Sequence, residues 1–496
     1  MTTQNALRGA LISLALVVLC TGFAFAAGGI EEVPVPGDDT SMGEAKYVFM
    51  FIGDGMGLPQ ISAAEAYLAS AEGQAVGIRK LSFSDFTAQG LTTTYAEDRF
   101  ITGSAASATA MACGEKTTIG TIAMDGSGSR VLPTIAEMAR DAGMKVGIVS
   151  SVDIDHATPA AFYAHAPSRG MYYEIGLQMI DSGFDYFGGG RVRLSKTPDG
   201  APTVLEEMER NGFTIADNRS EFNALGAGDA PMYAFDYGFA SDALEYEIDR
   251  EREDISIAEF TAKGIEVLDN PNGFFMMIEG GKIDWACHAN DGVSAIHDTI
   301  AFDEAVREAI DFYNQHPDET LIIVTGDHEC GGLRLGFAGT AYKTAFDTLA
   351  KQKVSFEAFN EYVFEPFKEQ NTLKGVDPDE LLPVIEEYFG LSDLSDYERR
   401  QIERAFARSM TDEEARSEND ETYITYGGYE PLTIALTHIV NQRAGLAWTS
   451  YKHTGVPVPT FAMGPGAGAF HGYYDNTDIF HKTVAAMGLR TAVASR

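Results

Sequence analysis

The sequence predicts an α/β fold: a three-layer sandwich with a central, largely parallel sheet, plus a helical insertion. Short apolar runs rich in β-branched and aromatic residues alternate with segments of helical periodicity, a pattern typical of parallel strands joined by helices. Between residues 341 and 450 these strand-like runs stop, and segments rich in Glu, Lys, Ala and Leu replace them. We therefore assign residues 46–340 and 451–496 to the core of the sandwich and residues 341–450 to the insertion.

The N-terminus has the pattern of a secretory signal peptide over residues 1–26. Arg8 precedes an apolar run that ends in Ala24-Phe25-Ala26, a cleavage site of the A-x-A type. The run is shorter than the roughly 20 apolar residues of a transmembrane helix, so we expect no stable membrane span. These features predict an exported protein, periplasmic or extracellular. Residues 27–45, rich in Gly, Pro and acids, predict a flexible tether.

Local patterns then place the elements of the core. Continuous apolar runs predict strands that are buried on both faces at residues 47–52, 145–150, 274–278, 321–324 and 458–463. Helical periodicity predicts helices at residues 133–142, 255–268 and 293–313. An Ala-rich segment forms a further predicted helix, with Ser104 at its N-cap or first turn and Gly114 at its end.

The composition excludes several classes of protein. The chain has 36 Lys and Arg against 73 Asp and Glu, a formal net charge of −37, which argues against a nucleic-acid scaffold as partner. Hydrophobic residues make up 45% of the chain, enough for a packed core, so intrinsic disorder is excluded. Cleavage would leave Cys113, Cys287 and Cys330, an odd number that excludes a disulfide framework. Whether Cys287 and Cys330 pair with each other or contact a metal ion stays open.

Acidic residues recur where the predicted strands end. Asp54, Glu279 and Asp327 each follow an apolar run, and in open α/β sheets binding sites form beyond these strand ends. A single such acid is usually a cap or turn residue, but several together would repel one another unless cations bind between them. The pattern therefore predicts a site for several metal ions.

Histidines supply further candidate ligands. Asp284 and His288 are four residues apart, which places both on one face of a helical turn. His328 follows Asp327 directly, and His453 stands in the Gly-flanked loop Lys452-His453-Thr454-Gly455. Mixed Asp and His ligands suit zinc, whereas oxygen ligands alone suit magnesium. Ser104 has two interpretations: a simple helix cap, or a nucleophile whose charge the helix N-terminus stabilises.

Several motifs together resemble the alkaline phosphatase family, including its secreted bacterial type, from about residue 46 to residue 479. They are Gly53-Asp54-Gly55-Met56-Gly57, Ser104 in a small-residue helix, Glu279-Gly280-Gly281-Lys282-Ile283-Asp284, Thr325-Gly326-Asp327-His328-Glu329 and His453-Thr454-Gly455. The resemblance implies hydrolysis of phosphate monoesters through a phosphoserine intermediate, with small phosphate esters as substrates and a possible homodimer. The nearest alternatives are a phosphodiesterase on the same fold and a non-catalytic phosphate- or metal-binding surface protein.

The resemblance also implies residue roles. Ser104 would be the nucleophile, and Arg169 would bind phosphate oxygens through its planar guanidinium. The implied metals are two zinc ions and one magnesium ion: the first zinc on Asp284, His288 and His453, the second on Asp54, Asp327 and His328, and the magnesium on Asp54, Thr158 and Glu279.

Three positions depart from the family pattern. Gly103 stands where the family usually has the Asp that anchors the phosphate-binding arginine, so we expect Arg169 to be less fixed. His156 and Trp285 stand where some relatives have Asp and Lys. We expect both to help bind substrate, with simple packing as the alternative role of Trp285.

Overall fold

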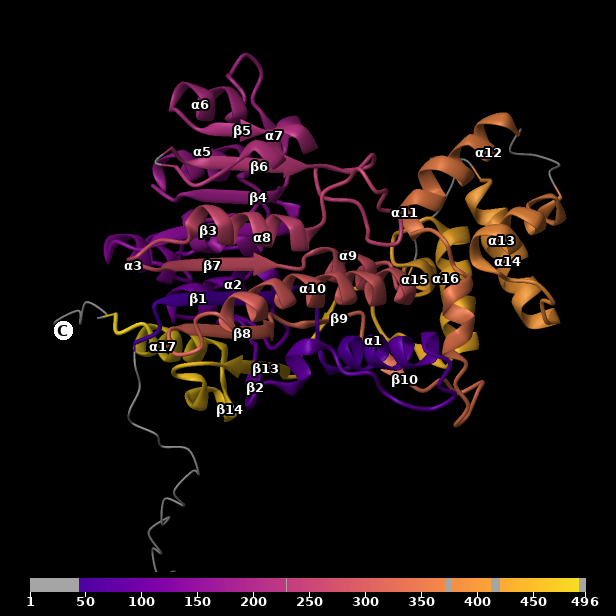
Figure 1. The fold of residues 1–496 in the computed structure, drawn as a ribbon. Coiled ribbons are helices and arrows are strands. Elements are labelled where there is room, and N and C mark those ends of the chain that lie inside the picture. Colours follow the sequence, from indigo (N-terminus) through magenta and orange to yellow (C-terminus); the bar gives the residue numbers. More distant parts are fainter. Residues whose placement is uncertain (1–43, 229, 372–376, 412–419, 490–496) are drawn as a thin grey trace, which may run out of the picture. The chain divides into compact units, whose positions relative to one another are not determined.

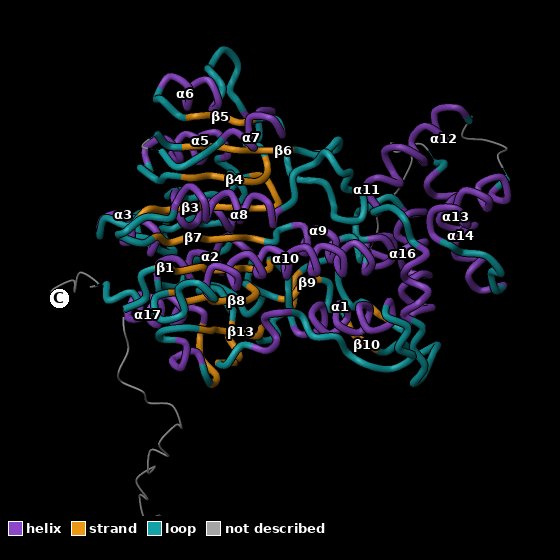
Figure 2. Tube along the Cα trace, in the orientation of Figure 1, coloured by secondary structure: helices purple, strands orange, loops and turns teal. Residues whose placement is uncertain are grey.

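The central layer is one ten-stranded sheet (Figures 1 and 2). The computed structural model describes residues 44–228, 230–371, 377–411 and 420–489. The sheet strands are β1 (Tyr47–Gly53), β2 (Ala88–Thr93), β3 (Lys145–Asp153), β4 (Tyr186–Gly190), β5 (Thr214–Ala216), β6 (Met232–Asp236), β7 (Phe274–Glu279), β8 (Thr320–Gly326), β13 (Val458–Met463) and β14 (Gly472–Asp475). Their order is β14-β2-β13-β8-β1-β7-β3-β4-β6-β5. Within the described residues β13 alone runs antiparallel to its neighbours, which confirms a largely parallel sheet.

All five predicted strands are present, and every residue of β1, β7 and β8 is buried. Residues that are apolar on both faces of a strand can be buried on both only if helices cover the sheet from two sides. The register pairs Ile52 of β1 with Glu279 of β7, and Gly53 of β1 with Gly326 of β8. The carboxyl ends of these three strands therefore lie level with one another.

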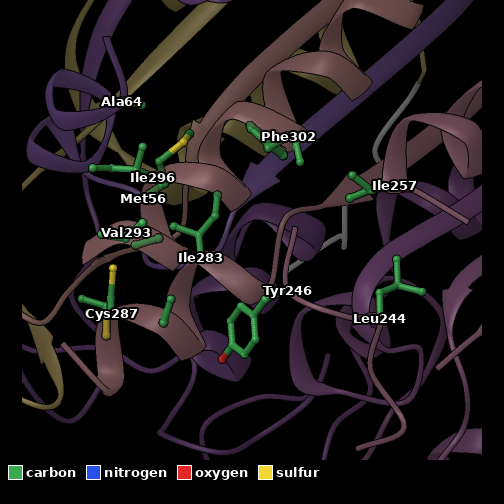
Figure 3. Close-up of a cluster of buried hydrophobic side chains, with 14 of the residues drawn as sticks. Met56, Ala64, Leu244, Tyr246, Ile257, Ile283, Cys287, Val293, Ile296 and Phe302 are labelled. Atoms are coloured by element: carbon green, nitrogen blue, oxygen red, sulfur yellow. The ribbon is translucent and has the colours of Figure 1, made fainter. Parts of the chain in front are cut away.

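Alternate residues of β1 enter two separate hydrophobic cores, one on each face of the sheet. Phe49 and Phe51 belong to the first core and Met50 and Ile52 to the second. The first core, part of which Figure 3 shows, is covered by α1 (Leu58–Ala71), α7 (Arg219–Ala224), α8 (Ile257–Leu268) and α10 (Gly292–Tyr313). The second is covered by α2 (Ser104–Cys113), α3 (Ile135–Asp141), α4 (Ala157–Tyr163), α5 (Tyr172–Asp181), α6 (Val204–Arg210) and α17 (Asn476–Ala486). These two helical layers and the sheet make the predicted three-layer sandwich.

The predicted helices begin and end within two residues of the observed ones, because their ends carry specific signals. Thr134 and Ser256 form capping boxes at the starts of α3 and α8, accepting the backbone N–H groups of Glu137 and Glu259. Helix α2 ends at Gly114, whose φ of 72° lies in the left-handed region that glycine favours.

The described part of residues 341–450 consists mainly of helices joined by turns and loops. It contains α11 (Phe356–Phe359), α12 (Glu365–Gln370), α13 (Leu382–Phe389), α14 (Asp396–Ser409), α15 (Asp420–Tyr426) and α16 (Pro431–Ala444). It also contains one short strand among its described residues, β11 (Leu446–Ala447), which pairs with β10 (Arg334–Leu335). In Figure 1 these helices lie beyond the arrowheads of the parallel strands, and side chains such as Phe359 and Leu436 continue the first core. The helical segment thus stands at the end of the sheet where the acids converge.

The predicted signal peptide, residues 1–26, and residues 27–43 of the predicted tether lie outside the described residues. Ala45, the last residue of that tether, is buried, and its N–H donates to the carbonyl of Ala486. No helix in the described ranges combines the length and apolar character that crossing a membrane requires.

Candidate metal centre

Three carboxylates meet at the carboxyl edge of the sheet. Asp54 follows β1, Glu279 ends β7, and Asp327 follows β8, with β1 lying between the other two strands. Each of these residues is at most 1% exposed. The burial of three acids side by side is costly unless cations offset their charge. The sequence predicted that the acids at these strand ends would converge, and they do.

A first cluster of donors lies beside these acids. It joins Asp284 and His288 of α9 (Lys282–His288) to His453 of β12 (His453–Thr454). His288 Nε2 lies 3.1 Å from His453 Nε2 and 3.2 Å from Asp284 Oδ2, and His453 Nε2 lies 3.6 Å from Asp284 Oδ1. Donors about 2.0–2.1 Å from a tetrahedral zinc ion are about 3.3 Å apart, so the spacing fits that geometry.

Hydrogen bonds on the far side of each ring orient the two histidines of this cluster. His288 Nδ1 lies 2.6 Å from the carbonyl oxygen of Tyr451, and His453 Nδ1 lies 2.9 Å from that of Thr102. A carbonyl can only accept, so each Nδ1 carries the proton and each Nε2 keeps its lone pair for the cluster. His453, which we expected in a loop, begins a two-residue strand that pairs with β9 (Glu329–Cys330).

A second cluster consists of Asp54, Asp327 and His328. His328 Nε2 lies 3.2 Å from Asp54 Oδ1 and 3.2 Å from Asp327 Oδ2. The other oxygen of Asp327 accepts the backbone N–H groups of Gly55, at 3.1 Å, and of His328, at 2.9 Å. Backbone donors therefore fix one carboxylate oxygen and leave the second directed into the cluster.

A third group shares Asp54 with the second. Ligand atoms of Asp54, His156 and Glu279 lie within 4.8 Å of one another. One oxygen of Glu279 accepts the Ser150 hydroxyl. Thr158, in the first turn of α4, is fully buried two residues after His156.

Several oxygen ligand atoms in these groups have no hydrogen-bond partner. Among the described residues, the buried side-chain atoms without a hydrogen bond include Asp54 Oδ1 and Oδ2, Thr158 Oγ1, Glu279 Oε1, Asp284 Oδ1 and Asp327 Oδ2. Buried polar atoms are normally satisfied, so this concentration of lone pairs at one place fits bound cations. The donor sets and their spacing thus fit zinc in the first two clusters and an oxygen-preferring ion such as magnesium beside Glu279.

Without cations these carboxyl groups would resist ionisation. Burial, together with the charges of Asp327 and Asp284, raises the pKa of Asp54 well above its usual value. Burial likewise raises the pKa of Glu279 to about 7 and that of Asp327 to about 8. Burial also opposes the charge of Asp284, but the imidazoles of His288 and His453 hold its pKa well below the usual range. Bound cations would keep all four ionised.

Ser104 lies at the edge of the second cluster. It is the first residue of α2, after Gly103 as N-cap, and its Oγ is 3.4 Å from His328 Nε2. The helix is buried along its whole length, and Ser107 ties it to the metal-binding edge by donating to the carbonyl of Asp327 at 2.6 Å. The free N–H groups of the helix start face the same region, a position that favours an anion.

Arg169 has a partner that the sequence did not reveal. Its Nη2 donates to His156 Nε2 at 2.6 Å, since a guanidinium has no acceptor. Burial and the charge of Arg169 hold the pKa of His156 well below its usual value, so the ring is neutral. The half-buried Trp285 packs edge-on against the same ring, with centroids 5.8 Å apart.

Two further residues lie at the site: Cys330, whose role the sequence left open, and Glu329, to which it gave no role. Cys330 lies close enough to Asp284, His288 and His453 to belong to the first cluster. Burial raises the pKa of its thiol well above the usual value, and Cys113, Cys287 and Cys330 are all free, so Cys287 and Cys330 do not pair. Glu329 accepts hydrogen bonds from Thr454 and Gln60, which holds the strand of His453 in place. The sequence signal that could have indicated this role is the position of Glu329 directly after His328, a candidate metal ligand.

A parallel α/β sheet with carboxylate and imidazole clusters at its carboxyl edge, next to a serine at a helix N-terminus, defines a metal-dependent hydrolase of phosphate esters. A family model described as alkaline phosphatase matches residues 45–489. The chain therefore belongs to the alkaline phosphatase family, whose members are metal-dependent phosphomonoesterases, and it is an enzyme of that type.

Individual alkaline phosphatases are similar to this chain over most of their length. Alkaline phosphatase 3 of Bacillus subtilis (strain 168) is 29% identical and the match covers 96% of both chains. A cold-active alkaline phosphatase from the psychrophile Shewanella sp. is 28% identical, with a TM-score of 0.73 over 89% of this chain and 99% of the other. A His-to-Asp mutant of alkaline phosphatase from the Antarctic bacterium TAB5, described with magnesium in its M3 site, is 25% identical, with a TM-score of 0.61 over 91% of this chain and 100% of the other.

Proposed function

We propose that the enzyme hydrolyses phosphate monoesters by double displacement at Ser104, releasing an alcohol and inorganic phosphate. The observation that supports this most directly is the position of Ser104 Oγ beside His328, at the edge of unpartnered metal-ligand donors. Asp284, His288 and His453 would hold the first zinc, Asp54, Asp327 and His328 the second, and Asp54, Thr158 and Glu279 a magnesium. Bound there, the ions would supply Lewis acidity that stabilises the serine alkoxide and the departing oxygen.

The residues of the chain perform the remaining steps. Ser104 Oγ attacks phosphorus in line with the ester bond. That bond breaks, the alcohol departs, and Ser104 is now a phosphoserine. Water then attacks the phosphoserine from the vacated side and releases phosphate. Arg169, which His156 holds in position, binds two equatorial oxygens of the phosphate. Trp285 packs against His156.

The test is turnover of an aryl phosphate by protein loaded with zinc and magnesium, compared with Ser104→Ala and the conservative Ser104→Thr. We expect Ser104→Ala to lose activity by a factor on the order of 10³ or more and, unlike the wild type, to form no acid-stable phosphoprotein. Metal analysis should return two zinc ions and one magnesium ion. Full activity in Ser104→Ala would show that the nucleophile is assigned wrongly.

Export and assembly are further proposals, which rest on the sequence and on family habit. We propose that residues 1–26 direct export to the periplasm or beyond and that the mature enzyme forms a homodimer. N-terminal sequencing of secreted protein should begin near Ala27, and sedimentation should give twice the mass of the mature chain.

A further inference from the structure

A cavity of about 300 Å³ opens beside the first cluster, between the core and the helical segment. Cavities of this size are large enough for a small ligand. The core contributes α9 and the segment before α8, while the helical segment contributes α11 and the turn before α16. Its lining consists of Tyr246, Trp285, His288, Phe356, Glu357 and Tyr429.

The cavity lies beside the first cluster, on the side of the metal centre that is farther from Ser104. Ser104 adjoins His328, the ring of His328 stacks on that of His453 with centroids 3.5 Å apart, and His453 adjoins His288 in the wall of the cavity. In an in-line displacement the leaving oxygen departs from the side opposite the nucleophile. The leaving group of a bound ester would therefore point toward this cavity.

The far wall of the cavity is aromatic and held in place. The Phe356 ring packs edge-to-face against Tyr246, at 5.7 Å between centroids, and against Tyr429, at 5.8 Å. Phe356 N–H donates to Asp291 Oδ2 at 2.9 Å, so α11 is tied to the N-cap of α10. Tyr246 belongs to the first core, and Figure 3 shows its ring. Such preformed aromatic surfaces favour stacking with flat rings.

A cationic ligand is disfavoured in this cavity because the ammonium group of Lys282 already lies over its aromatic rings. The buried Lys282 ammonium lies 3.6 Å from the ring centre of Tyr246 and 5.1 Å from that of Trp285. It also lies 3.5 Å from Glu357, whose side chain is 25% exposed. Lys282 thus occupies the cation position over these rings and offsets the charge of Glu357, whose carboxylate can still accept a hydrogen bond from a ligand.

Building on the proposed function, we propose that this cavity binds the leaving group and favours phosphate esters that carry a planar ring with hydrogen-bond donors, such as nucleoside monophosphates. The ring would stack on Tyr429 and meet Phe356 edge-on, because these two rings stand at 90° to each other, and an amino or hydroxyl group would donate to Glu357. Small aliphatic esters would react without using the cavity.

Kinetics with matched variants test the proposal. Tyr429→Leu removes the ring at similar volume, and Tyr429→Phe keeps it. We expect the ratio of kcat/KM for adenosine 5′-monophosphate to kcat/KM for glycerol 3-phosphate to fall on the order of tenfold in Tyr429→Leu, mainly through KM. The ratio should stay within about twofold in Tyr429→Phe. An unchanged ratio in Tyr429→Leu would overturn the proposal, as would a stronger preference for phosphocholine than for adenosine 5′-monophosphate.

A binding measurement separates the cavity from the chemistry. The chain has two tryptophans, of which Trp285 lines the cavity and Trp448 does not, so Trp448→Phe leaves Trp285 as the reporter. Adenosine should quench this fluorescence, glycerol should not, and Tyr429→Leu should weaken the quenching. Absence of quenching in the metal-loaded protein would overturn the cavity proposal and leave the phosphatase intact. Quenching without hydrolysis of any ester would refute the proposed function and retain the cavity.

Discussion

The carboxyl edge of the sheet and the helical wall of the leaving-group cavity differ in how locally their residues are encoded. At the sheet edge each donor stands at a strand end or within one helical turn of another donor, as Asp284 and His288 do. At the wall, Phe356 and Tyr429 are 73 positions apart, and tertiary packing alone brings them together. In the proposed mechanism, local motifs would therefore supply the reacting groups, and long-range packing would supply the selectivity.

The two regions also differ in how well their polar atoms are satisfied. The donors at the sheet edge include buried atoms without protein partners, whereas Glu357 in the wall has Lys282 as its counter-charge. Loss of a group at the edge leaves other buried charges uncompensated, which is expensive. We therefore expect large, general effects at the edge and moderate, substrate-dependent effects at the wall.

The largest effect should come from Asp54→Ala. Asp54 contributes to both the second cluster and the group of Glu279, so its loss should release two of the three proposed ions. We expect kcat/KM to fall on the order of 10³ or more, beyond the roughly 10–100-fold cost of changing an outer hydrogen bond to a metal ligand. Metal analysis and turnover measure this together. Asp141→Ala, at an exposed position, is the control. Retention of three ions would contradict the shared role of Asp54.

Metal removal should make stability depend on pH. The pKa of Glu279 is raised to about 7 and that of Asp327 to about 8, above unfolded values of about 4. The folded, metal-free protein therefore holds more protons than the unfolded chain across this interval, and its stability falls as the pH rises from about 4 to about 8. Calorimetry should show Tm declining from pH 5 to 8 in chelated protein and less so in metal-loaded protein. Parallel curves for the two forms would contradict this.

The same contrast explains what the sequence could predict. The strand ends, the i,i+4 pair on α9 and the capping boxes depend on neighbouring residues, so Asp54, Asp284, His328 and the fold could be assigned. The contact between His156 and Arg169, and the pairing of β12 with β9, depend on side-chain direction and on loops that meet in space. No spacing along the chain encodes such contacts.

A moderate effect is expected from His156→Asp, at a position that sequence reasoning could not resolve. A carboxylate there would join Asp54 and Glu279, whose oxygens prefer magnesium, and could still pair with Arg169. We expect magnesium affinity to rise about tenfold, because the substitution adds a charged oxygen ligand of the kind that magnesium prefers. Titration calorimetry and the magnesium dependence of kcat measure it. His156→Gln keeps an acceptor for Arg169 without adding charge, so an equal gain there would exclude the carboxylate explanation.

The smallest effect should come from Gly103→Asp, although this position departs most clearly from the family pattern. Gly103 has an ordinary φ of −123°, and a Cβ there would meet only Ile119 at 3.5 Å, so aspartate fits without strain. Because His156 already positions Arg169, a second anchor should lower KM and strengthen phosphate inhibition only about two- to fivefold. Gly103→Asn separates the two consequences: as an equally good N-cap it should match any gain in Tm, worth a few tenths of a kcal/mol, without the change in KM. A lower KM in the native Gly103 enzyme than in Gly103→Asp would mean that His156 alone holds Arg169 in its best position. Phosphate binding by Arg169 would then depend on a long-range contact, as the cavity wall does.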